Sequence, residues 1–102
     1  MEKPQVITSL DGDIQIVNYR ISTSMFGDLF AAGTVENISS KSNLTAVVKA
    51  DYYDANGNYI DSETDTVRRL EPGETGAFEV VYSGQIRYRI KDLKLSVDTI
   101  IL

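Results

Sequence analysis

The sequence predicts an all-β protein, an antiparallel two-sheet sandwich of immunoglobulin or fibronectin-III type with six to seven strands. Three observations support this. Apolar and polar residues alternate along most of the chain. Residues that favour strands are frequent, among them six Tyr and three Phe. Turn signals recur about every ten residues, as in sandwiches and barrels. A small Greek-key barrel is the alternative. The Cys–Trp–Cys core of antibody domains is excluded, because the chain has neither Cys nor Trp.

The first strand is expected at 14–21, where the apolar positions change phase. Ile14 and Ile16 share one phase, whereas Val17, Tyr19 and Ile21 take the other. A phase change inside one strand indicates a β-bulge, or a strand that crosses from one sheet to the other.

The central strands are expected at 29–37 and 44–54, both of which alternate in hydrophobicity. The segment 54–57, Asp-Ala-Asn-Gly, has the residues of a bulged hairpin turn. Residues 58–70 return antiparallel and are long, polar and charged, which is typical of an edge strand protected against self-pairing.

The second half continues with a type II turn at 71–74, where Pro and Gly take the central positions. Strands are expected at 76–83 and 93–102, joined by 84–92 as a connection containing a short strand or turn. The domain is therefore assigned to residues 14–102, and residues 1–13 to an N-terminal extension, native or appended.

Composition narrows the function classes. The 102 residues suit one domain, and the net charge of −5 opposes binding to nucleic acid or an anionic membrane. No apolar run is long enough to insert into a membrane. Without His or Cys, the zinc, copper and haem sites built on those ligands are excluded, as are Ser–His and Cys–His nucleophile pairs. A small hydrolase built on paired carboxylates, or a Ser–Lys enzyme, stays open as an alternative, although 102 residues leave little room for both a core and a catalytic cleft. We expect no enzyme, no cofactor and no metal, and favour a monomer.

Three segments resemble the FxLYD domain family, small sandwich domains of bacteria and archaea. The family's Gly-x-Val-x-Asn segment corresponds to residues 33–37, its Tyr-Asp motif and hairpin Gly to Tyr53, Asp54 and Gly57, and its Leu-x-Pro-Gly-Glu-Thr turn to residues 70–75 before Phe78. Ala50 and Tyr52 depart from the Phe and Leu of the naming motif. The resemblance implies an extracytoplasmic module, in the cell envelope or secreted, and no catalytic role.

The segment 51–63 also resembles a calcium-binding EF-hand loop, but its register fails. If Gly57 is the sixth loop position, the first is Tyr52, which is no carboxylate ligand, and strands rather than helices flank the loop. The hairpin interpretation is favoured, and a weak calcium contact at Asp54, Asp61 and Glu63 stays open as an alternative.

A possible interaction surface comprises Phe30, Tyr53, Tyr59, Asp61 and Glu63. Tyr combines apolar area with a polar tip, and Phe30 is apolar on an otherwise polar strand face. Residues 67–70, Val-Arg-Arg-Leu, are interpreted as a local charge partner of the acids at 61, 63 and 65.

Asn37-Ile-Ser39 and Asn43-Leu-Thr45 fit the N-glycosylation sequon, either by chance or, in a secreted eukaryotic protein, as true acceptors. We expect a non-catalytic protein-interaction or spacer module of a larger secreted or envelope-anchored prokaryotic protein, whose partners are neighbouring domains or another protein. The alternative is a ligand-binding module, with a glycan or weak cation site on the 53–65 hairpin.

Overall fold

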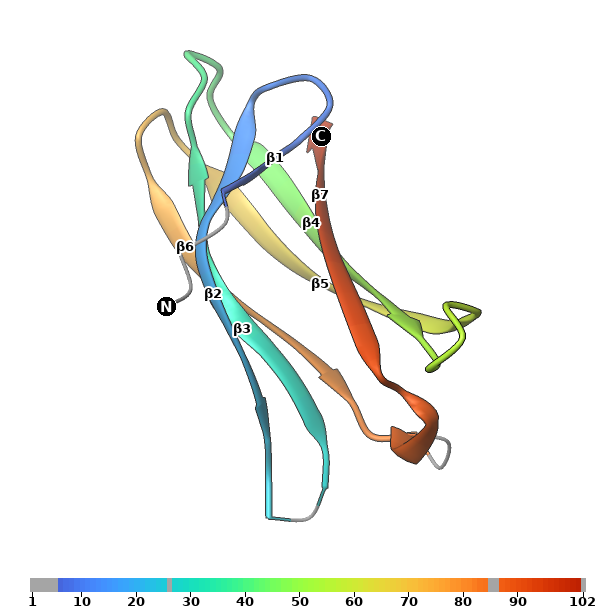
Figure 1. Ribbon diagram of the computed structural model, residues 1–102. Coiled ribbons are helices and arrows are strands. Elements are labelled where there is room, and N and C mark those ends of the chain that lie inside the picture. The colour runs from blue at the N-terminus through green and yellow to red at the C-terminus, as the bar shows by residue number, and fades with distance from the viewer. Residues whose placement is uncertain (1–5, 26, 85–86, 102) are drawn as a thin grey trace.

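The computed structural model describes residues 6–25, 27–84 and 87–101, which form the two packed layers of strands seen in Figure 1. Within these residues the elements are β1 (Ile7–Thr8), β2 (Ile14–Thr23), β3 (Leu29–Asn37), β4 (Leu44–Tyr53), β5 (Tyr59–Leu70), β6 (Thr75–Tyr82), the 3-10 helix η1 (Arg87–Arg89) and β7 (Asp92–Ile101). None of the described residues forms a helix long and apolar enough to cross a membrane.

The strands form two separate antiparallel sheets. Sheet A has the order β1-β2-β3-β6 and sheet B the order β5-β4-β7. Strand β3 pairs with β6 while β4 and β5 lie in the other sheet, so the chain crosses between the layers as in immunoglobulin-like sandwiches. Each sheet ends in edge strands and does not close into a barrel with the other sheet. The predicted sandwich is therefore confirmed, and the barrel alternative is wrong.

The core lies between the sheets and follows the predicted alternation. Every second residue of β4, from Leu44 to Tyr52, is completely buried. Sheet A contributes Val35 from β3, and the inward residues of β6 include Phe78 and Tyr82. The Tyr52 and Tyr82 rings pack at 4.8 Å between centroids, one from each sheet. Period-two patterning therefore directs one face of each strand into a shared core.

The phase change in the first strand is a β-bulge, as predicted. The pairing of β2 with β3 shifts between Ile16 and Asn18, so the side chains change face at this point. Opposite the bulge, a Cβ on Gly33 would lie 2.1 Å from the Asn18 carbonyl oxygen. Gly33 is therefore required because the two backbones approach closely.

Both predicted turns are present. Gly57 closes the β4–β5 hairpin at a φ of 82°, and its N–H donates to the Asp54 carbonyl. Gly73 has a φ of 82° at the third position of the 71–74 turn, and the Glu74 N–H donates to the Glu71 carbonyl. These are the left-handed positions that such turns give to glycine.

The folded domain begins earlier than the boundary placed at residue 14. Ile7 and Thr8 form β1, which pairs with Ile16 and Gln15 of β2. Residues 9–13 form the loop that joins these strands, and Ser9 and Asp13 are buried there. This part of the expected extension is thus held by backbone pairing as an edge of sheet A. Residues 1–5 lie outside the described part.

Candidate functional site

The hairpin that resembled a calcium loop is organised by its own aspartate. The Asp54 carboxylate accepts hydrogen bonds from the backbone N–H groups of Asn56 and Asn58, each at 2.9 Å. The hydrogen bond from the Asn58 backbone, more than any other contact, lowers the pKa of Asp54. The carboxylate is therefore occupied in shaping the turn, and among the described residues no group of His, Cys, Asp and Glu is arranged to hold a metal ion.

An aromatic corner, defined as Tyr53, Tyr59 and Lys94, lies beside this turn on the outer side of sheet B. The Tyr53 and Tyr59 rings meet edge to face at 6.1 Å, and the Lys94 Nζ lies 5.3 Å from the Tyr53 ring centroid. Tyr59 is 58% exposed. The corner thus offers apolar area, a hydroxyl and a cation to solvent, which suits recognition of a partner.

The acids of β5 point toward the edge of the other sheet. Strand β5 lies beside β6, and the Asp65 carboxylate accepts the Glu79 backbone N–H at 2.7 Å. Asp61 accepts the Tyr82 hydroxyl at 3.3 Å and is half-buried, whereas Glu63 is exposed. Asp65 therefore satisfies an edge group of β6 that would otherwise be open to pairing with another chain.

The five predicted surface residues do not form one surface. Tyr53 and Tyr59 belong to the aromatic corner, and Asp61 and Glu63 follow the β5 edge beside β6. Phe30 lies in sheet A, where it pairs with Ser22 and Val81 and is partly buried. The alternation of apolar and polar residues along a strand correctly predicts which face of the sheet each side chain occupies. It does not predict which strands of the two sheets become neighbours.

The hydroxyl of Tyr52 is the one buried side-chain polar atom of the described residues without a hydrogen-bond partner. Burial, together with the nearby charge of Glu63, raises the pKa of Tyr52 to about 12. The same burial and the charge of Asp61 raise the pKa of Tyr82. Two neutral phenols are therefore packed beneath the acids of β5.

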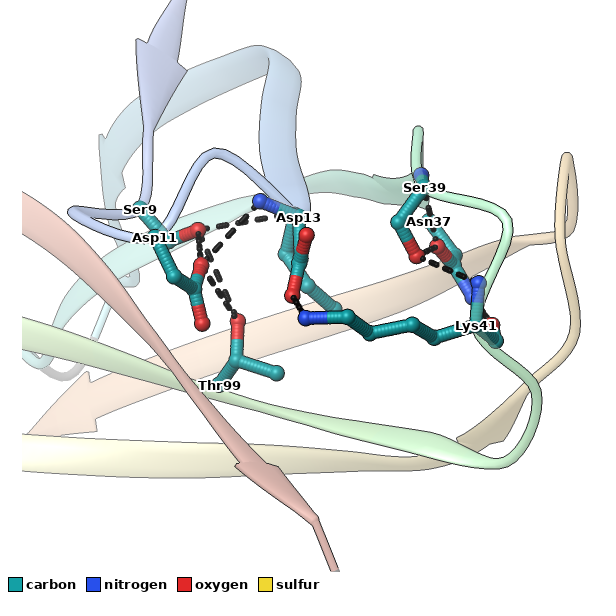
Figure 2. Close-up of polar contacts among 8 residues, drawn as sticks. Ser9, Asp11, Asp13, Asn37, Ser39, Lys41 and Thr99 are labelled. Carbon is teal, nitrogen blue, oxygen red and sulfur yellow. Dashed lines mark hydrogen bonds and ion pairs between the residues drawn. The ribbon is translucent and has the colours of Figure 1, made fainter.

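A polar cluster, drawn in Figure 2, lies near the start of β4, at the other end of that strand from the Asp54 turn. Asp13 forms an ion pair with Lys41 at 2.8 Å, and Asp11 accepts hydrogen bonds from the hydroxyls of Ser9 and Thr99. These contacts join the 9–13 loop to the 38–43 loop and to β7. Sequence reasoning missed this cluster because it assigned residues 1–13 to an extension, although the Asp-Gly-Asp run at 11–13 signals an ordered turn.

Asn37 is the central residue of this end of the fold. Its side-chain amide donates to the carbonyls of Lys41 and Leu70 and accepts from the backbone N–H and hydroxyl of Ser39. The side chain is completely buried, and Figure 2 shows it facing Ser39 and Lys41. The engagement of both amide hydrogens and the burial of Asn37 oppose a role as a glycosylation acceptor, whereas Asn43 is exposed.

The segments that carry the FxLYD resemblance are explained by folding. Gly33 admits the Asn18 backbone, and Asn37 bonds the Leu70 carbonyl at the end of β5. The Gly73 N–H then donates to the Asn37 carbonyl at 2.8 Å. Two of the three segments, 33–37 and 70–75, therefore meet at one structural junction, whereas the 53–57 segment forms the hairpin turn at the other end of β4.

A pocket of about 170 Å³ opens where β4 begins and β5 ends, lined by Asn43, Thr45, Arg68 and Arg69. Neither arginine forms an ion pair within the described residues, so the interpretation of residues 67–70 as a charge partner of the β5 acids is corrected. The sequence shows the pair of consecutive arginines, but regular strand alternation predicts that consecutive residues point to opposite faces of a sheet. The sequence therefore did not predict that both arginines line one pocket.

Comparison with known proteins gives relatives of undefined activity. No family model matches the chain. The chain is 28% identical over 68 residues to the uncharacterized protein MJ0360 of Methanocaldococcus jannaschii, a match that covers 67% of this chain and 50% of that protein. The match thus spans about half the length of the archaeal relative.

The fold is shared with the crystal structure of Campylobacter jejuni cj0090. The TM-score is 0.55 at 15% identity, over 81% of this chain and 83% of that chain. Likeness at this identity is evidence of the sandwich fold alone.

Proposed function

We propose that the chain is a non-catalytic interaction or spacer module of a larger secreted or envelope-anchored prokaryotic protein. The observation that carries the proposal is that carboxylates of the domain are engaged in structural contacts. Asp54 shapes a turn, Asp65 covers the β6 edge and Asp13 pairs with Lys41. A catalytic carboxylate must instead direct a free oxygen toward substrate in a cleft.

Three further observations support the module's setting. The archaeal relative extends beyond the matched region, which covers 50% of its length, so the matched part is one portion of that protein. The relative comes from an archaeon, which fits a prokaryotic source. The likeness to the FxLYD family, carried by the 33–37, 53–57 and 70–78 segments, favours an extracytoplasmic location.

The aromatic corner is the surface that we expect to make the contact. A photo-crosslinking phenylalanine analogue at position 59 of the full-length parent protein tests this in the native host. We expect crosslinks to a neighbouring domain or another protein, and few from the same analogue at the exposed position 18 of sheet A. Equal labelling from both positions would contradict the assignment, and recovery of the tagged protein in the cytosol would contradict the location.

A ligand-binding module is the second candidate, favoured by the exposure of Tyr59. Its ring is accessible, and its hydroxyl donates to the Ser62 hydroxyl at 2.9 Å, which holds the ring in place. Such a fixed ring suits stacking against a sugar. A glycan array read against the Tyr59→Ala variant tests this candidate, since a sugar contact must be lost with the ring.

A further inference from the structure

A second β-bulge directs two consecutive arginines toward one side of sheet B. Leu44 pairs with Leu70 and Ala46 with Val67, so Thr45 alone opposes both Arg68 and Arg69. In a regular strand these neighbours would point to opposite faces. The bulge changes the aim of one of them, and both line the same pocket.

The backbone of this pocket is strained on both of its sides. Among the described residues, Asn43 with a φ of 60° and Arg69 with a φ of 61° are the non-glycine residues with positive φ. Both line the pocket. Asparagine tolerates this conformation, but arginine rarely adopts it, and strain of this kind gathers at functional sites. Glycine is the residue that bulges with a left-handed position usually have there.

The side chains that line the pocket end in hydrogen-bond donors, and none of them is a carboxylate. The guanidinium groups of Arg68 and Arg69, the side-chain amide of Asn43 and the hydroxyl of Thr45 form no hydrogen bond with a described residue. The neighbouring Glu71 carboxylate is used by the Asn43 backbone N–H at 3.0 Å. Neither arginine forms an ion pair with a described residue, in a chain with a net charge of −5.

We propose that this pocket is an oxyanion-binding site for a phosphate or sulfate group. Two guanidinium groups match the charge of a dianion and can each donate two parallel hydrogen bonds to its oxygens. Thr45 is 4% exposed and lines the pocket, so its hydroxyl can donate a further hydrogen bond to the anion. This site is independent of the proposed interaction surface, which lies at the other end of β4.

Backbone amide NMR with added inorganic phosphate tests the proposal, at constant pH and ionic strength. We expect saturable shifts confined to residues 43–45 and 68–70. Sulfate and glycerol phosphate serve as parallel arms. Binding of glycerol phosphate at least as tightly as inorganic phosphate assigns the site to a phosphate ester, and tighter binding of the inorganic ions assigns it to the free anion.

Two variants separate binding from folding. Arg69→Gly keeps the positive φ without strain, and Arg68→Gln changes an exposed side chain, so both should remain folded. Each is expected to weaken phosphate binding by about tenfold or more, the usual effect of losing a charge-assisted hydrogen bond. The matched control Arg20→Gln, an exposed arginine of sheet A, should leave binding unchanged.

Three results would overturn the assignment. The first is an equal shift pattern with chloride at the same ionic strength, and the second is retained binding in the Arg68→Gln and Arg69→Gly double variant. The third is an equal loss in Arg20→Gln, because this would show that phosphate responds to net charge rather than to the pocket.

Discussion

The substitution Asn37→Ala should lower the stability of this domain more than a comparable substitution of a surface residue. The Asn37 amide donates to the Lys41 and Leu70 carbonyls at 2.8 and 2.9 Å. Its oxygen accepts the Ser39 backbone N–H at 2.9 Å and the Ser39 hydroxyl at 2.7 Å. One side chain thus joins the end of β3 to the 38–43 loop and to the end of β5.

The expected cost follows from these four contacts. A net contribution of about 1 kcal/mol for each of the four hydrogen bonds gives roughly 4 kcal/mol, with about 1 kcal/mol of variation between contexts. We therefore expect a loss of about 3–5 kcal/mol. A domain of this size is stable by only about 5–15 kcal/mol, so the variant should approach marginal stability.

Urea unfolding followed by circular dichroism measures the change, since the midpoint falls in proportion to stability at a constant slope. Asn18→Ala is the matched control, because Asn18 is exposed in β2 and should cost less than about 0.5 kcal/mol. If Asn37→Ala lost less than about 1 kcal/mol, or no more than Asn18→Ala, the assignment of Asn37 as a structural junction would be refuted.

Three other predictions test separate parts of the fold. Gly33→Ala should lower the urea midpoint by the equivalent of about 3 kcal/mol, because the new Cβ meets the Asn18 carbonyl, and an unchanged midpoint would contradict this contact. Tyr52→Phe should be neutral or stabilising by up to about 1 kcal/mol, because the hydroxyl it removes is buried without a partner. The raised pKa of Tyr52 keeps its phenol neutral in the folded state, whereas the same phenol ionises in the unfolded chain. Wild-type stability should therefore fall between pH 10.0 and about 12, and the stability of Tyr52→Phe should fall less. Parallel pH profiles of the two proteins would contradict this assignment. Calcium at millimolar concentration should leave the hairpin amides unmoved, since the Asp54 carboxylate already accepts two backbone N–H groups, and saturable shifts there would restore the cation site.

Local patterns were sufficient wherever the structure depends on neighbours in sequence. The bulge after Ile16 was visible as a change of hydrophobic phase, and the β4–β5 turn as Asp54 followed by Gly57. Both features are set within a few residues by side-chain period and backbone conformation. The same reasoning placed Phe30 with the tyrosines of the hairpin, and the structure separates them because Phe30 belongs to the other sheet.

The candidate site was less predictable because it depends on pairing across strands. Arg68 and Arg69 were expected to neutralise the acids of β5. The bulge opposite Thr45 turns both arginines into a pocket instead. Residues 67–70 alone do not predict this β-bulge, because arginine rarely adopts a positive φ.

By itself the sequence determined the all-β class, the strand faces and the two glycine turns, because alternation and turn chemistry act over short distances. Only the tertiary structure decided that Asn37 bonds to Leu70, thirty-three positions away, and that Asp65 covers the edge of β6. Such contacts require two sheets to pack in one particular register, and that register is set by the whole core rather than by any single segment.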